Sequence, residues 1–278
     1  MAKLTKTRGI ARYDTLDVAV RNGIGLIAFD RPAVHNAFNE TLINELTAAL
    51  EAMAIDDAVR IVVLLGHGTS FCAGADLNWM KKMAAFGAAE NRADARALAR
   101  MLSTLDRLEK PTVASVHGSA FGVGVGLIAC CDIAIAAQEA TFALSEGKLG
   151  LIPATISPYV IEAIGPRQAR RLFLTAECVT AAEAYRLGLV HDLAPAAELE
   201  NRVNDLLGML LLAGPNAQRE CKALIRSVAH RPIDDGVIAH TVEQVAAVRA
   251  SPEGREGVAA FLGKRTAAWV PKALRGGK

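Results

Sequence analysis

The chain has 278 residues, of which 52% are hydrophobic and 22% charged, and its formal net charge is +2. This length suits one large domain, or one domain with an appendage, and allows a sizeable core. The mild charge and the lack of an aromatic, basic stripe argue against a nucleic-acid-binding protein, but they are compatible with a phosphorylated ligand held by a few local cations.

Cysteine usage and hydropathy favour a cytoplasmic protein. The five cysteines are odd in number, and their spacings fit neither a disulfide ladder nor a metal site. Cys130 and Cys131 are neighbours within an apolar run, so we expect buried free thiols and a reducing compartment. The first residues hold no apolar leader segment, and no window is apolar enough to span a membrane.

Strand and helix patterns alternate as far as about residue 198, which is typical of an α/β fold. Asn22-Gly23 separates two apolar runs and predicts a hairpin turn, and Asn39 is a predicted N-cap. In chain order, the predicted elements are strands at 18–20 and 24–29, a helix from Glu40, a strand at 60–65, helices near Asp76 and over 91–108, a strand at 112–116, a helix at 127–131, a strand at 133–137, and helices at 167–174 and 181–187.

From Leu199 the pattern is helical to the end of the chain. The predicted helices cover 199–212, 216–228, 234–248 and 252–261, and proline-containing dipeptides separate the last three from what precedes them. We therefore predict a core domain over residues 1–198 and a helical region over residues 199–278 that serves docking or oligomerisation.

The stretch from Pro111 to Pro153 holds the residues best suited to chemistry. A β-branched strand runs into a glycine-dense turn and a short helix, and such a turn presents unpaired N–H groups that stabilise negative charge. The letters GVGVG also suggest a dinucleotide-binding loop, but the third glycine of that motif is misplaced. Glu146, a short loop away, could move a proton.

Three segments in register resemble the crotonase superfamily, also called the enoyl-CoA hydratase/isomerase family. They are SFCAGADLN at 70–78, VHGSAFGVGVGLIACCDIAIAA at 116–137 and FALSEGKLGLIPA at 142–154. The resemblance implies the crotonase (ClpP/crotonase-like) fold, a spiral of β-β-α units with a C-terminal helical oligomerisation region. It also implies a homotrimer or a dimer of trimers, no metal, and no cofactor beyond the CoA of the substrate.

By the same resemblance, the catalytic groups are the backbone N–H groups of Ala75 and Val123 and the carboxyl group of Glu146. The two donors would hold the thioester carbonyl oxygen as enolate charge develops, a role worth roughly 3 kcal/mol for each donor. Glu146 would carry the proton at C2. Its apolar sequence neighbours would raise the carboxyl pKa toward a useful range; they are Phe142, Leu144, Leu149 and Ile152.

Two positions depart from the family pattern. Family hydratases usually carry a second glutamate where this chain has Gly126, so the obvious base for water is missing. Val123 stands where glycine is usual, and its N–H can donate only if its φ is negative. His117 could replace the missing acid, but a histidine with a structural hydrogen bond is the more ordinary interpretation.

Other residues match family positions that bind CoA. They are Arg31, Ala33, Val34, Ala73, Asp76, Leu77, Phe261 and Lys264, of which the last two would reach the CoA of a neighbouring subunit. Asp76 also suits the N-cap of the following helix, and a lysine near the end of a chain is often only solvated. Trp79 and Met80 could line the acyl pocket or belong to the core.

The resemblance thus implies an enoyl-CoA hydratase. The wording GADLNWM, LIACCDIAIA and SEGKLGLIPATISPYV is most similar to the branch of 3-methylglutaconyl-CoA and isohexenylglutaconyl-CoA hydratases, which implies a branched glutaconyl-type thioester. A Δ3,Δ2-enoyl-CoA isomerase, which needs a single glutamate, is the first alternative. A CoA-ester binding protein without turnover is the second. A dicarboxylic substrate would need a cation near its far carboxylate, and the candidates are Lys81, Lys82, Arg92 and Lys148.

Overall fold

A computed structural model describes residues 12–275 of the chain, which form two compact units. The first holds residues 12–108 and 112–204, and the second holds residues 109–111 and 205–275. The N-terminal residues in which we expect no leader segment lie largely outside the described range, since the structure begins at residue 12.

A six-stranded sheet forms the centre of the first unit, in the order β1-β2-β3-β4-β6-β9. All its neighbouring strands are parallel except β1 and β2, which form the predicted antiparallel hairpin. Asn22 and Gly23 have φ values of 52° and 85°, as a tight hairpin turn requires. The strands are β1 Leu16–Arg21, β2 Ile24–Phe29, β3 Ile61–Gly66, β4 Thr112–Val116, β6 Ile133–Ala137 and β9 Asp192–Ala194.

A second sheet of three short strands, β5 Ser119–Phe121, β7 Thr141–Ala143 and β8 Cys178–Thr180, has the order β5-β7-β8. The order strand, strand, helix recurs along the chain. It occurs as β1, β2 and α1 (Glu40–Ile55), as β4, β5 and α4 (Val123–Cys130), and as β6, β7 and α5 (Ser157–Thr175). These repeats confirm the predicted β-β-α units.

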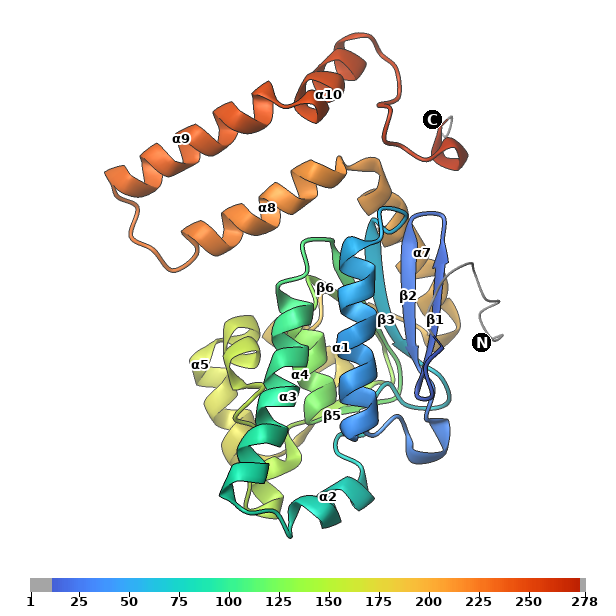
Figure 1. Cartoon of the computed structure of the whole chain (residues 1–278), viewed down its shortest axis with the longest axis vertical. Helices are drawn as coiled ribbons and strands as arrows, with labels where there is room; N and C mark the ends of the chain where they lie inside the picture. The colour runs from blue at the N-terminus through green and yellow to red at the C-terminus, as the bar shows by residue number, and fades with distance from the viewer. Residues whose placement is uncertain (1–11, 276–278) are drawn as a thin grey trace. The chain divides into compact units, whose positions relative to one another are not determined.

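Helices α1, α3, α4 and α5 pack against one another in succession (Figure 1). Asn39 caps α1 as predicted, because its Oδ1 accepts from Leu42 N at 3.0 Å. The remaining elements of this unit are α2 Leu77–Met83, α3 Ala88–Asp106, α6 Ala181–Leu187, and the short 3₁₀ helices η1 Pro32–Val34, η2 Ser145–Leu149 and η3 Ala196–Glu198. Helix α7 (Leu199–Leu212) runs on into the second unit.

Three phenylalanines in the core support the loop that follows β3. The rings of Phe29 and Phe38 meet edge to face with centroids 5.5 Å apart, and those of Phe29 and Phe71 do so at 5.3 Å. All three side chains are fully buried. The chain entering residues 72–76 is therefore anchored on a rigid apolar cluster.

The second unit contains helices α8 Pro215–Val228, α9 Asp235–Ala250, α10 Pro252–Leu262 and the 3₁₀ helix η4 Lys272–Leu274. Helices α8 and α9 lie side by side (Figure 1). Polar side chains cap two of them, since Asp234 accepts from Val237 N and Ser251 accepts from Gly254 N. The helices predicted after residue 199 are confirmed to within about two residues at each end.

The sequence prediction was wrong about where α4 begins. The glycine-dense stretch was expected to be a turn before a helix at 127–131, whereas α4 begins at Val123 and contains Gly124 and Gly126. The helix near 167–174 also begins earlier, because α5 starts at Ser157 and continues through a break at Gly165, whose φ is 75°. Strands β5, β7, β8 and β9 were missed; each has only three residues and shows no alternating pattern.

Candidate active site

Residues 72–75 lie along strand β5, which leads into helix α4. Cys72 donates its N–H to Ser119 O at 3.0 Å, and Phe121 N–H donates to Cys72 O at 2.8 Å. A methyl group placed on Gly122 would lie 3.8 Å from the Cα of Gly74. The residues immediately before Ala75 and Val123 are therefore in close approach, although the two predicted donors are 48 positions apart in the sequence.

The backbone N–H groups of Ala75 and Val123 donate no hydrogen bond to any atom of residues 12–275. For Ala75 the direction of the N–H is fixed. Gly74 O accepts from Phe38 N at 2.8 Å, and the N–H across a trans peptide points opposite to its C=O. The Ala75 N–H thus points away from Phe38. Val123 is the first residue of α4, where an N–H has no partner within its helix, and its φ is not positive.

Glu146 lies in η2, and its carboxyl group reaches Gly122. Strand β7 pairs in parallel with β5, and Gly122 N–H donates to Ala143 O at 2.9 Å, which holds the chain before Glu146 against the start of α4. A methyl group on Gly122 would lie 3.1 Å from Glu146 Oε1. The structure therefore brings Glu146 next to Gly122, which precedes Val123 and itself lies close to Gly74.

The carboxyl group of Glu146 is poorly solvated. Its Oε2 is buried and has no hydrogen-bond partner within the described chain. Burial raises the pKa of Glu146, and a hydrogen bond from its own backbone opposes only part of that rise. Phe142 and Leu144 are buried as expected, whereas Leu149 and Ile152 are exposed and do not enclose the carboxyl group. Such a group suits proton transfer.

Gly126 lies one helical turn beyond Gly122 on α4, because its N–H donates to Gly122 O at 3.2 Å. A Cβ on Gly126 would lie 2.3 Å from Ile156 Cγ2 and 3.7 Å from Leu102 Cδ2. The place where the family pattern has a second acid is therefore filled by an apolar side chain. Sequence analysis missed Ile156, since an isoleucine before Ser157-Pro158 carries no functional pattern.

The predicted CoA-binding residues of the first unit fall into two groups. Ala33 and Val34 in η1 are exposed, and Leu77 is 73% exposed, so their apolar surfaces are open to a ligand. Ala73 N–H donates to His35 O at 2.9 Å, which joins the two loops. Arg31 and Asp76, by contrast, are bound to each other.

Phe261 and Lys264, which were predicted to serve a neighbouring subunit, belong to the second unit. Phe261 is 82% exposed on α10, and Lys264 follows that helix with a φ of 50°. Their CoA contacts stay predictions.

Two weaker candidates have structural partners. His117 lies within hydrogen-bond distance of Gly68 O, with Nε2 at 3.0 Å, and burial lowers its pKa. Trp79 is buried and donates to Asp94 Oδ1 at 3.1 Å, and burial raises the pKa of Asp94. Both arrangements favour the structural interpretation over a ligand contact.

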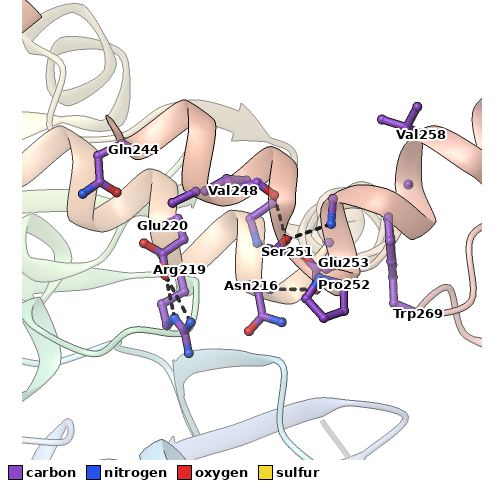
Figure 2. Close-up of a pocket in the computed structure, with 15 residues that line it drawn as sticks. Asn216, Arg219, Glu220, Gln244, Val248, Ser251, Pro252, Glu253, Val258 and Trp269 are labelled. Atoms are coloured by element: carbon purple, nitrogen blue, oxygen red, sulfur yellow. Dashed lines mark hydrogen bonds and ion pairs between the residues drawn. The ribbon is translucent and has the colours of Figure 1, made fainter. Parts of the chain in front are cut away.

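A cavity of about 630 Å³ lies in the second unit among α8, α9, α10 and Trp269 (Figure 2). The carboxylate of Glu253, which lines this cavity, accepts hydrogen bonds from Asn216 N and Ala217 N. The exposed pair Arg219–Glu220 lies on the same wall. None of the predicted catalytic residues lines this groove.

Across residues 12–275, His, Cys, Asp and Glu side chains form no group of three or more that could hold a metal ion. In the same range, every helix is too short or too polar to cross a membrane.

Comparison with known proteins covers nearly the whole chain. The family model described as Enoyl-CoA hydratase/isomerase matches residues 19–272. A crystal structure of an enoyl-CoA hydratase from Shewanella pealeana is 43% identical, with a TM-score of 0.90 over 93% of this chain and 97% of that chain. The crotonyl-CoA hydratase of Syntrophomonas wolfei is 32% identical over 94% of this chain and 99% of its own length. The 2,3-dehydroadipyl-CoA hydratase of Escherichia coli is 32% identical over 90% and 96%, respectively.

Proposed function

The chain belongs to the enoyl-CoA hydratase/isomerase family, and we propose that it adds water across the C2=C3 bond of a 2-enoyl-CoA with Glu146 as its proton carrier. The observation that carries this proposal is the meeting of the Glu146 carboxyl group with Gly122, beside two backbone N–H groups that lack partners within residues 12–275. No cofactor is invoked, because the CoA belongs to the substrate.

In the proposed mechanism, the N–H groups of Ala75 and Val123 hold the thioester carbonyl oxygen. Charge moves onto that oxygen when C3 is attacked, so fixed donors stabilise the transition state more than the ground state. The ionised carboxyl group of Glu146 takes a proton from water as the water oxygen bonds to C3. The same carboxyl group then gives that proton to C2, which restores the carbonyl and the carboxylate.

This scheme uses one acid for both proton transfers. It agrees with the apolar wall at Gly126, where Ile156 leaves no room for a second carboxyl group. That wall also favours one alternative, the Δ3,Δ2-enoyl-CoA isomerase, because moving a proton between C2 and C4 needs a single acid and no water.

We further propose a branched glutaconyl-type acyl group. The wording GADLNWM, LIACCDIAIA and SEGKLGLIPATISPYV supports it. The relative named 2,3-dehydroadipyl-CoA hydratase shows that the family includes hydratases named for dicarboxylic substrates. Lys82 is paired with Glu40 in an exposed ion pair. The remaining candidates for the far carboxylate are Lys81, Arg92 and Lys148.

Assembly and location complete the proposal. We expect a trimer or a dimer of trimers, and exposed apolar residues in the second unit support this assembly; they include Ile225 on α8, Val242 and Val245 on α9, and Val258, Phe261 and Leu262 on α10. Light scattering at several concentrations tests the assembly.

We also propose a cytoplasmic location, since all five cysteines are free thiols.

The test of function follows the ultraviolet absorbance of the conjugated enoyl thioester. Crotonyl-CoA and 3-methylglutaconyl-CoA are compared as substrates for the native protein, and a 3-enoyl-CoA tests isomerisation by a gain of absorbance. Loss of absorbance with either 2-enoyl ester supports hydration, and the faster ester identifies the acyl class. Gain with the 3-enoyl ester alone makes the protein an isomerase. No change with any ester leaves only CoA-ester binding.

A further inference from the structure

Arg31 and Asp76 form an ion pair that is largely shielded from solvent. Arg31 Nη2 lies 2.9 Å from Asp76 Oδ2, and the two side chains are 17% and 8% exposed. The other arm of the guanidinium group donates to Ala37 O. The second oxygen of Asp76 accepts from Asn78 N at 2.8 Å and from Trp79 N at 3.2 Å, which caps α2.

The same segment of chain is fixed by a buried asparagine. Asn36 Oδ1 accepts from Arg31 N at 2.9 Å, and Asn36 Nδ2 donates to His67 O and to Ser70 O at 2.9 and 2.7 Å. Asn36 is completely buried. Residues 31–38 therefore bind the loop after β3 at both of its ends.

Between these attachments lies Ala75. Phe38 donates to Gly74 O and accepts from Asp76 N at 2.9 Å, so the residues on both sides of Ala75 are bound to Phe38. The Arg31–Asp76 pair links the two segments a second time. Arg31 donates to the carbonyl group of Ala37, which precedes Phe38, and it also donates to Asp76, which follows Ala75. The ion pair thereby holds the backbone at Ala75 in place, and with it the direction of the Ala75 N–H.

We infer that Arg31 and Asp76 are positioning residues for the Ala75 N–H and do not bind the CoA nucleotide. This inference rests on the proposed role of Ala75 as a donor to the thioester oxygen. The pairing also makes Arg31 a weak ligand for phosphate, since its charge is already balanced by a carboxylate at hydrogen-bond distance.

Asp76 holds its negative charge firmly. Burial alone would raise the pKa of Asp76, but the hydrogen bonds from Arg31 and from the two capping N–H groups outweigh it, so the pKa is lowered. The pair therefore stays ionised throughout the neutral range.

Binding of two CoA compounds tests the inference. Acetoacetyl-CoA has a thioester carbonyl, whereas free CoA has none, so only the first engages the Ala75 N–H. In Asp76→Asn, the side-chain oxygen can still cap α2, but the amide nitrogen cannot accept from Arg31. Arg31→Lys keeps the charge and loses the two-armed geometry. Arg100→Gln is the matched control, since it breaks an exposed pair with Glu51 at 2.8 Å.

By calorimetry, we expect Asp76→Asn to weaken acetoacetyl-CoA binding by roughly 10- to 100-fold. The affinity for free CoA should change by less than about twofold, which is within ordinary variation for a residue outside the contact. The acetoacetyl-CoA affinity of Arg31→Lys should lie between those of Asp76→Asn and the native protein, and the affinity of Arg100→Gln should equal that of the native protein. Thermal unfolding of each variant checks that it is folded at the temperature of the titration.

Equal losses for both compounds would show that the pair binds CoA and would overturn the inference, as would unchanged binding of both. If the native protein itself binds acetoacetyl-CoA no more tightly than CoA, the donor role in the proposed function fails and the positioning role falls with it. A native preference that Asp76→Asn retains refutes the positioning role alone.

Discussion

Gly122 is the N-cap of α4 and Gly126 lies one turn into that helix, yet they lack a side chain for different reasons. Gly122 has φ 50° and ψ −114°, a conformation that side chains rarely allow, and it faces the Glu146 carboxyl group. Gly126 is helical, and its missing Cβ leaves space that Ile156 fills. One glycine thus borders a polar site, and the other forms part of an apolar core.

Positions only one helical turn apart therefore serve different purposes, the first in the proposed catalytic site and the second in core packing. At Gly122, a substitution should disturb the carboxyl group and the first N–H of α4. At Gly126, it should disturb only the contact with Ile156. Variants at Glu146, Gly122 and Gly126 therefore separate the polar side of α4 from its apolar side.

The largest effect should come from Glu146→Gln. This change keeps the shape of the side chain but removes the proton carrier, so activity should fall by roughly 10²- to 10⁴-fold, the usual contribution of general acid–base catalysis. The rate of C2 hydrogen exchange in deuterated water measures the loss for a hydratase and an isomerase alike. Glu139→Gln, on an exposed loop between β6 and β7, is the control. Near-native exchange in Glu146→Gln would remove Glu146 from the mechanism.

Gly122→Ala should reduce both activity and stability. The conformation of Gly122 should cost about 1–3 kcal/mol for a residue with a side chain. The added methyl group would also lie 3.1 Å from Glu146 Oε1 and displace the carboxyl group. We expect kcat to fall at least tenfold at a temperature where circular dichroism shows a folded protein. An unchanged kcat would mean that the carboxyl group does not act from this position.

Gly126→Ala should reduce stability by about 1–3 kcal/mol, as overpacking of a core does, and leave kcat near its native value. The cause is the contact with Ile156 Cγ2 at 2.3 Å. Urea unfolding measures the loss. When Ile156 is also replaced by Ala, Gly126→Ala should lower the free energy of unfolding by much less. The interaction energy from this double-mutant cycle should be about 0.5–3 kcal/mol, as for other residues in contact. Additive losses would show that Ile156 does not limit this position.

The smallest effect concerns pH. The raised pKa of Glu146 means that the folded state keeps this proton at pH values where the unfolded chain has released it. The free energy of unfolding should therefore fall as pH rises through that window, from the ordinary carboxyl range up to the folded pKa. Glu146→Gln should show a flatter profile and be at least as stable as the native protein at pH 8. A steeper profile in the variant would contradict the sign of the shift.

Much of the fold could be predicted because long apolar runs and caps leave clear patterns. The β1–β2 hairpin, the N-cap at Asn39 and the helices after residue 199 all follow from local sequence. The start of α4 could not be predicted, because a helix that begins Val-Gly-Val-Gly opposes helix propensity and depends on packing against β5 and α5.

The site could be predicted only in part. The resemblance suggested Glu146, Ala75 and Val123, and the structure brings their segments together, but their roles stay predictions until activity is measured. The partners of Arg31 and the filling of the space beside Gly126 depend on residues 45 and 30 positions away, respectively. Such distant contacts leave no local pattern in a single sequence.

The N–H of Ala75, which has no partner in the described chain, has a consequence for hydrogen–deuterium exchange. An amide without an acceptor does not need local unfolding to exchange, so Ala75 should exchange faster than its neighbour Asp76, whose N–H is bonded to Phe38 O. A bound thioester should slow exchange at Ala75, and free CoA should not. Exchange at a single amide would thus report occupation of the site in the absence of any reaction.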